Sequence, residues 1–165
     1  MSSTLQSSKS DLKFEDFKVG QAFKSRIRID KDEFEKYLSF AKTKNILHEN
    51  PKLAAKEGIK STTLLPGRSV LARAEGEMTR LDAFSNNIML LYGMDGDPSW
   101  NNRQTRFLAE VYAGNELEVE YSISDKKGGG NSERYGILSI DVQIKRISDN
   151  KLVIISRRNL YRIKK

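Results

Sequence analysis

Residues 116–123 read ELEVEYSI and residues 138–145 read LSIDVQIK, and the alternation of apolar and polar side chains in these two stretches decides the fold. The apolar members are Leu117, Val119, Tyr121 and Ile123 in the first stretch and Leu138, Ile140, Val142 and Ile144 in the second. Successive side chains of a strand point to opposite faces, so each stretch predicts a strand with one buried face and one solvated face.

Further strands are predicted on both sides of this pair. Residues 152–163 give a last strand that alternates less strictly, and residues 23–29, 88–92 and 103–109 give three more. The Gly-rich sequence at 128–131 and the Ser-Asp-Asn sequence at 148–150 are typical of turns. Turns of this kind join neighbouring antiparallel strands, so the sheet is predicted to be antiparallel.

Two short helices are predicted in the first half of the chain. Asp30 begins the first, because Glu33 stands three residues later and completes a capping box. Its apolar stripe is Phe34, Tyr37, Leu38 and Ala41. Asn50 and Pro51 open the second, which Gly58 can close in a left-handed conformation. The intervening residues 44–49 are expected to form a loop.

A longer helix is predicted over residues 68–81, after the sequence LLPG at 64–67. Its apolar side is Val70, Leu71, Ala74, Met78 and Leu81. Gly76 is unfavourable inside a helix, so Ala72, Ala74 and Gly76 are expected to let the sheet pack closely; a helix weakened or bent at Gly76 is the alternative. The predicted fold class is α+β, with an antiparallel sheet curled around this helix.

The composition restricts the chemistry. The chain has 165 residues, no cysteine and one histidine, His48, which excludes a cysteine nucleophile and a metal site built from His and Cys ligands. No metal and no cofactor are therefore expected. Residues 1–12 are expected to be a flexible segment and 13–165 a single domain. No run approaches the roughly 18 apolar residues of a membrane span, and a cytoplasmic protein is expected.

His48 has two interpretations. Imidazole is the side chain whose ordinary pKa suits acid/base chemistry near neutral pH, which makes His48 the first candidate for such a role. A single histidine in a loop is also often structural or solvated, and the sequence leaves both interpretations open.

Positive charge is concentrated at the C-terminal end. The formal net charge is +7, and residues 145–165 contain eight basic residues and one acid, Asp149. This basic ribbon could bind nucleic acid, contact the phosphates of a nucleotide-bearing ligand, or form a solvated sheet edge that discourages pairing with other sheets. No recognition helix or RNA-stacking strand accompanies it, so nucleic acid is the least favoured partner.

Three segments carry a family resemblance. Residues 106–117, RFLAEVYAGNEL, resemble the RF-x-x-PV-x-x-GD-x-L segment of MaoC-like hot-dog proteins, the (R)-specific enoyl-CoA hydratases and acyl dehydratases. Residues 14–21, FEDFKVGQ, resemble the beginning of that family's domain. Residues 37–48 align without gaps on its hydratase motif, FA-x-L-(S/T)-G-D-x-N-P-x-H. The resemblance extends over about residues 14–163.

The resemblance implies a hot-dog fold, a dimer formed through the sheets, and an active site at the dimer interface. It implies a CoA or acyl-carrier thioester as substrate and hydro-lyase chemistry, in which water adds across a trans-2-enoyl thioester. By position, His48 corresponds to the acid/base residue, Asn45 to the residue that orients the loop or the water, and Gly67 to the donor for the thioester oxygen. The residues expected to bind substrate are Thr43, Pro66, Arg68 and Ser69.

Several positions depart from the family pattern. Thr43 stands where the family has its catalytic Asp, and it has no carboxylate to act as a base at neutral pH. Ile46 and Glu110 stand in place of two prolines, and Ala72 in place of a serine. Glu49 and Glu110 are the candidates for a replacement carboxylate.

Three functions therefore remain open. The first is an enoyl-CoA hydratase or 3-hydroxyacyl dehydratase with an altered acid/base pair. The second is a non-catalytic acyl-CoA-binding or acyl-carrier-binding protein, or a scaffold subunit. The third is a hot-dog thioesterase in which Glu49 or Glu77 activates water. A homodimer is expected, and a heteromer is the alternative, because a protomer without the family Asp could use a partner's chemistry.

Overall fold

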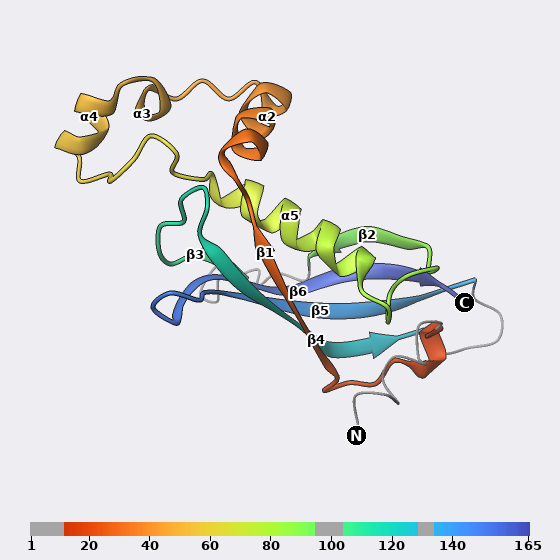
Figure 1. Ribbon diagram of the computed structural model, residues 1–165. Coiled ribbons are helices and arrows are strands. Elements are labelled where there is room, and N and C mark those ends of the chain that lie inside the picture. Colours follow the sequence, from red (N-terminus) through yellow and green to blue (C-terminus); the bar gives the residue numbers. More distant parts are fainter. Residues whose placement is uncertain (1–11, 95–103, 129–133) are drawn as a thin grey trace.

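The computed structural model describes residues 12–94, 104–128 and 134–165, and the strands within these ranges form one antiparallel sheet (Figure 1). The strands are β1 (Ala22–Arg28), β2 (Met89–Met94), β3 (Thr105–Phe107), β4 (Glu116–Lys127), β5 (Tyr135–Arg146) and β6 (Lys151–Lys164). Their order is β1-β4-β5-β6-β2, and β3 also pairs with β6. The antiparallel sheet predicted from the sequence is confirmed.

Alternation fixes the register between β4 and β5. Val119 pairs with Ile144 and Tyr121 with Val142, so their apolar side chains share one face of the sheet. The opposite face carries charge, as in the ion pairs of Lys24 with Glu118 and Glu120. A slip of one residue would expose the whole apolar row, so the register is strongly specified.

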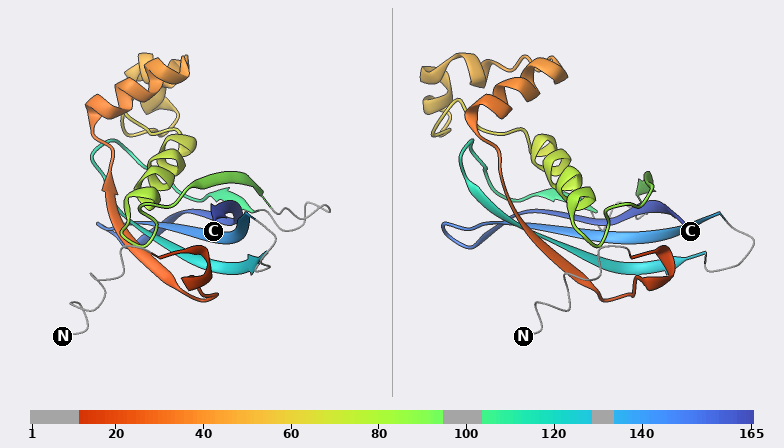
Figure 2. Two further views of the ribbon diagram at one scale, coloured as in Figure 1. Left: turned by 90° about the vertical axis from the view of Figure 1, so that its right-hand side faces the viewer. Right: turned by 45° about the vertical axis from the view of Figure 1, so that its right-hand side comes forward.

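The helix α5 (Gly67–Arg80) covers the apolar face, and the sheet curves around it (Figures 1 and 2). Val70, Ala74 and Met78 are fully buried in the shared core. Tyr121 donates a hydrogen bond of 2.5 Å from its hydroxyl to the Ala74 carbonyl, and Tyr161 donates one of 2.6 Å to the Glu75 carboxylate. These bonds hold the helix in place above β4 and β6, as the predicted α+β arrangement requires.

Between residue 12 and α5, the structure contains four shorter helices. They are the 3₁₀ helix η1 (Phe14–Asp16) and the α-helices α2 (Lys31–Ala41), α3 (Ile46–Glu49) and α4 (Pro51–Lys56). The predicted capping box of α2 is present, with a 2.8 Å hydrogen bond from the Glu33 amide to the Asp30 carboxylate. Asn50 caps α4, and Gly58 follows it with a φ of 80°. Figure 1 shows α2, α3 and α4 beyond the amino end of α5.

Two local predictions were wrong. The segment around His48 is a short helix, α3, because the Asn45 side chain accepts a hydrogen bond of 3.2 Å from the Leu47 amide and caps it. Gly76 is exposed, and a Cβ added there would meet nothing within 4 Å, so close packing of the sheet does not explain it. Residues 1–11 of the predicted flexible segment and parts of the strand at 103–109 and the turn at 128–131 lie outside the described residues.

One edge of the sheet exposes apolar side chains. Strands β2 and β3 both pair with the same side of β6. The exposed apolar residues on and beside them, here called the apolar edge, are Ile88, Leu90, Leu91, Tyr92, Met94, Phe107 and Leu108. In the described part of the chain, no helix has the length and apolar character to cross a membrane.

Candidate functional site

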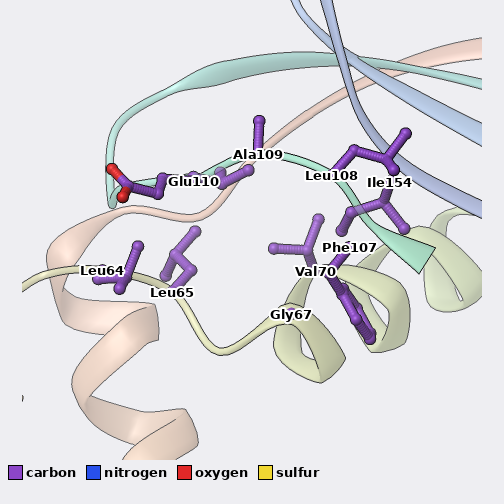
Figure 3. A pocket seen from close by; sticks show the side chains of 10 residues that line it. Leu64, Leu65, Gly67, Val70, Phe107, Leu108, Ala109, Glu110 and Ile154 are labelled. Carbon is purple, nitrogen blue, oxygen red and sulfur yellow. The ribbon is translucent and has the colours of Figure 1, made fainter.

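The amino end of α5 borders an apolar cavity of about 350 Å³ (Figure 3). Its lining residues are Leu64, Leu65, Gly67, Val70, Phe107, Leu108, Ala109, Glu110, Val111 and Ile154. The carboxylate of Glu110 is the charged group of this lining. The cavity therefore suits a ligand with an apolar part and a polar end. The apolar part would contact the lining, and the polar end would lie near the start of α5.

Gly67 is the first residue of α5, and its backbone lies directly against the ring of Phe107 (Figure 3). A Cβ at position 67 would fall 2.2 Å from Phe107 Cδ1, so glycine is required for this approach. The first amides of a helix lack acceptors within the helix and carry positive potential. Ser69 directs both its amide and its hydroxyl to the Pro66 carbonyl, at 2.9 and 2.6 Å. The Gly67 amide is thus suited to donate to a carbonyl oxygen in the cavity.

His48 is half-buried and held by a backbone carbonyl. Its Nδ1 lies 2.9 Å from the Thr62 carbonyl oxygen, and its ring meets Phe34 edge-on with centroids 5.3 Å apart. A carbonyl accepts only, so Nδ1 carries the proton and the lone pair of the neutral ring lies on Nε2. No described residue forms a hydrogen bond with Nε2. The ring is therefore arranged to accept a proton at Nε2.

A short segment leads from the partner of His48 to Gly67. The Leu65 amide donates to the Val111 carbonyl at 2.8 Å, so the segment after Thr62 is held against residues 111–113. His48 is not part of the lining of the apolar cavity. The fold thus connects the two predicted catalytic positions through the backbone without placing them in one cavity of the protomer.

Thr43 and Asn45 lie on the exposed connection between α2 and α3. The Thr43 amide donates to the Leu38 carbonyl at 3.0 Å, just after Lys42, which ends α2 in a left-handed conformation. The Asn45 side-chain oxygen is used to cap α3. Arg68 is exposed and Ser69 is buried, with its hydroxyl bound as described above. Of the predicted substrate-binding residues, Pro66, Arg68 and Ser69 flank Gly67 in the turn that the bonds from Ser69 to Pro66 close, whereas Thr43 lies on the connection between α2 and α3.

The candidate carboxylates differ in their environment. Glu49 is exposed on α3, next to His48 in the sequence. Glu110 accepts a 2.7 Å hydrogen bond from the Tyr112 hydroxyl. The pKa of Tyr112 is raised, first by burial and second by this bond. Glu77 accepts hydrogen bonds from Arg73 at 2.8 Å and Ser25 at 3.0 Å, and the bond from Arg73 is the main cause that lowers the pKa of Glu77. Of these three carboxylates, Glu49 therefore has the fewest hydrogen-bond partners.

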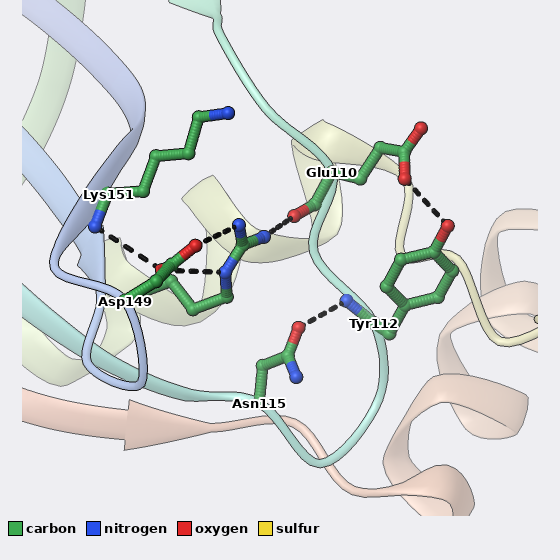
Figure 4. Close-up of polar contacts among 6 residues, drawn as sticks. Glu110, Tyr112, Asn115, Asp149 and Lys151 are labelled. Atoms are coloured by element: carbon green, nitrogen blue, oxygen red, sulfur yellow. Dashed lines mark hydrogen bonds and ion pairs between the residues drawn. The ribbon is translucent and has the colours of Figure 1, made fainter. Parts of the chain in front are cut away.

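A second, polar groove of about 650 Å³ adjoins the apolar cavity. Figure 4 shows polar contacts among residues that line it. Its lining residues are Lys60, Leu108, Ala109, Glu110, Tyr112, Asn115, Arg146, Ser148, Asp149 and Lys151. Arg146 binds the Asp149 carboxylate through Nε at 3.0 Å and Nη2 at 2.7 Å, and this pairing lowers the pKa of Asp149. Arg146 Nη1 also donates to the Glu110 carbonyl. The arginine thereby fastens the turn between β5 and β6 to the segment that separates the two hollows.

The groove is the feature that the sequence did not predict. The basic ribbon at 145–165 was the sequence feature that pointed to it, but the fold places only some members of that ribbon at the groove. Arg146 and Lys151 line the groove, whereas Arg162 lies over the Tyr92 ring at 4.5 Å and Lys165 near the Phe14 ring at 5.6 Å. No group of three or more His, Asp or Glu side chains suited to a metal ion occurs within the described ranges.

Comparison with solved structures identifies the fold. A monoamine oxidase regulatory protein from Archaeoglobus fulgius is similar with a TM-score of 0.72 and 18% identity, over 93% of this chain and 94% of that one. The R-hydratase PhaJ1 from Pseudomonas aeruginosa gives 0.67 and 16%, over 93% and 85%. The MaoC-like dehydratase from Rhodospirillum rubrum gives 0.63 and 15%, over 94% and 99%.

A further similar structure is a complex of two different proteins, ChsH1–ChsH2 from Mycobacterium tuberculosis, with a TM-score of 0.60 and 10% identity, over 89% of this chain and 97% of that one. No protein-family model and no curated protein matches the chain. The predicted hot-dog fold of MaoC-like dehydratases and (R)-hydratases is confirmed by the solved structures.

Proposed function

We propose that the protein is an acyl-thioester hydratase or dehydratase, which adds water to a trans-2-enoyl thioester of CoA or an acyl carrier or removes it from the (R)-3-hydroxyacyl product. The observation that carries the proposal is the amino end of α5, where Gly67 lines the apolar cavity. An apolar acyl chain fits such a lining, and a helix amino end stabilises the negative charge that develops on a thioester oxygen.

The reaction assigns a role to each predicted catalytic residue. The Gly67 amide donates a hydrogen bond to the thioester oxygen, which lowers the energy of the enolate. His48 Nε2 takes a proton from water as the water oxygen bonds to C3, and the protonated ring gives that proton to C2 as the enolate collapses. Asn45 holds the helix turn that carries His48, through its cap on α3. Glu49, beside His48, is the proposed replacement for the carboxylate that Thr43 lacks, and Glu110 is the alternative.

A dimer formed at the apolar edge is part of the proposal. Phe107 and Leu108 belong both to this edge and to the lining of the cavity, so a second copy bound there would border the cavity. An exposed apolar sheet edge in a chain of this size is typical of an interaction surface. Since ChsH1–ChsH2 joins two different proteins in this fold, a heteromer is the alternative assembly.

A second candidate is a protein that binds acyl thioesters without converting them. Thr43 offers no carboxylate, and none of the described carboxylates forms a hydrogen bond with His48. Loss of one member of an acid/base pair typically costs a factor of about 10² or more in rate. The cavity and the helix amino end would serve binding equally well in such a protein.

Hydration of crotonyl-CoA, followed by the loss of enoyl absorbance, tests the two candidates. We expect turnover in the wild type and its loss in His48→Ala. If Glu49 is the replacement carboxylate, Glu49→Gln should lower the rate about 10²-fold relative to the wild type. Thr43→Asp is the matched gain-of-function variant. No turnover in the wild type together with turnover in Thr43→Asp would leave the binding protein as the function. Release of free CoA without hydration would instead mark a thioesterase.

A further inference from the structure

The polar groove combines cations from separate parts of the sequence. Lys60 comes from the connection before α5, and Lys151 from the first position of β6. Neither ammonium group forms an ion pair in the described part of the chain, and Figure 4 shows that of Lys151 directed away from Asp149. Two unpaired ammonium groups in one hollow favour an anionic ligand.

Both acidic side chains of the groove have hydrogen-bond partners within the protein. Asp149 is bound to Arg146 through two hydrogen bonds, so this pair adds little net charge. Glu110 accepts the Tyr112 hydroxyl. The Tyr112 hydroxyl is neutral, so Glu110 keeps its negative charge, and the three cations and two carboxylates of the lining leave the groove a net charge of +1 for an anionic ligand.

Neutral donors add to these lysines. Asn115 accepts a hydrogen bond of 2.8 Å from the Tyr112 amide at its side-chain oxygen, which fixes the amide orientation and leaves its NH₂ group directed elsewhere (Figure 4). No described residue accepts from that NH₂ group or bonds to the Ser148 hydroxyl. Two ammonium groups, an amide and a hydroxyl are a donor set suited to phosphate oxygens.

The groove and the apolar cavity share a wall made by Leu108, Ala109 and Glu110. A ligand that filled both would have an apolar end, a polar connection near Glu110 and an anionic end. An acyl thioester of phosphopantetheine has this order of groups, whether it ends in the nucleotide of CoA or is attached to a carrier protein.

We propose that the polar groove binds a phosphate of the phosphopantetheine arm while the acyl end occupies the cavity beside Gly67. This inference rests on the proposed function for the identity of the acyl end. It assigns Lys60 and Lys151 to phosphate binding and Asn115 and Ser148 to hydrogen bonding with the same group. It also gives Lys151, a member of the basic ribbon, a role at the first position of β6.

Calorimetric titration of the full-length protein with butyryl-CoA tests the groove without requiring turnover. We expect the Kd to rise about tenfold in Lys60→Gln/Lys151→Gln, as two charge-assisted contacts would give when partly exposed. The matched control is Lys164→Gln, an exposed lysine at the opposite end of β6, which should leave the Kd unchanged. Higher salt should weaken binding in the wild type more than in the double variant.

Two truncated ligands identify the phosphate and separate the two proposals. Butyryl-pantetheine, without phosphate, should bind the wild type and the double variant equally. If butyryl-phosphopantetheine shows the effect, the pantetheine phosphate occupies the groove, and if only butyryl-CoA shows it, the nucleotide phosphates do. Equal affinity of wild type and double variant for butyryl-CoA would overturn the groove and leave the proposed function intact. Absence of binding by all three ligands would overturn both.

Discussion

The ring of Phe107 occupies the space that a side chain on Gly67 would need, with Cδ1 2.2 Å and Cε1 2.3 Å from the position of a Cβ. Phe107 lies on the three-residue strand β3 and its side chain is half exposed. Phe107 therefore forms the surface side of this contact, and the first residue of α5 forms its inner side.

Gly67→Ala should lower the free energy of unfolding by about 1 kcal/mol, because the new methyl group displaces the ring of Phe107. The added Phe107→Ala change should remove this clash, so a double-mutant cycle in urea should give a coupling energy of roughly 1 kcal/mol. Strict additivity of the two changes would show that the ring and the glycine do not touch in solution.

Gly76→Ala should stabilise the protein by about 0.5–1 kcal/mol. Gly76 lies in the interior of α5, is exposed, and has open space where a Cβ would lie. Alanine has the higher helix propensity and restricts the unfolded chain. Chemical denaturation of the variant and the wild type checks this prediction, and a loss of stability would mean that Gly76 has a contact in the assembled protein.

Gly136→Ala should have the opposite effect. A Cβ at position 136 would fall 2.1 Å from Phe14 Cζ, and Phe14 is fully buried with Lys126 against its ring at 4.6 Å. We expect a loss of about 1–3 kcal/mol in the free energy of unfolding, since a buried ring cannot move aside. The contrast with Gly76→Ala in one set of denaturation curves provides the control. Equal stabilities of the two variants would contradict the packing described here.

Stability should fall in acid partly through Glu77. Hydrogen bonds from Arg73 and Ser25 lower the pKa of Glu77 below its ordinary value of 4.5. A lowered pKa means that the unfolded state binds the proton more tightly, so this contribution is complete above the ordinary pKa and is lost as the pH falls through the folded-state pKa. Glu77→Gln should therefore flatten the dependence of unfolding free energy on pH below about 4.5. An unchanged slope would show that the three groups are not paired in solution.

Leu91→Lys should shift the protein from dimer to monomer, because it places a charge in the middle of the apolar edge. Leu91 is 58% exposed on β2. Phe40→Lys is the matched control, since Phe40 is 87% exposed but lies on α2, away from that edge. Sedimentation velocity measures both variants, and a monomer in Leu91→Lys with a dimer in Phe40→Lys is the expected result. A dimer in both variants would move the interface elsewhere.

Local rules predicted the elements whose causes are local. The alternation at 116–123 and 138–145 needed no knowledge of the rest of the chain, and neither did the caps at Asp30 and Asn50. Gly76 was misinterpreted because the sequence shows that a helix has a buried side but not how far the covering layer extends around it. The order of family-like segments was sufficient to predict the hot-dog fold.

The candidate site was only partly predictable, because its groups are distant in the sequence. Lys60, Arg146 and Lys151 meet only through the sheet and its connections. The bond between Glu110 and Tyr112 did have a local signal, since side chains two apart in extended chain lie on the same side. The separation of His48 from the cavity within a protomer follows from the path of residues 62–67, for which the sequence gives no rule.

The attachment of His48 to the Thr62 carbonyl has a consequence for sequence variation. A histidine oriented by a carboxylate loses its tautomer when one partner residue changes. Every amino acid supplies a carbonyl, so substitutions at position 62 that keep the backbone path would leave the proton on Nδ1 and the lone pair on Nε2. The tautomer of the ring is thereby independent of the side chain at position 62, and relatives of this protein can vary at that position without changing it.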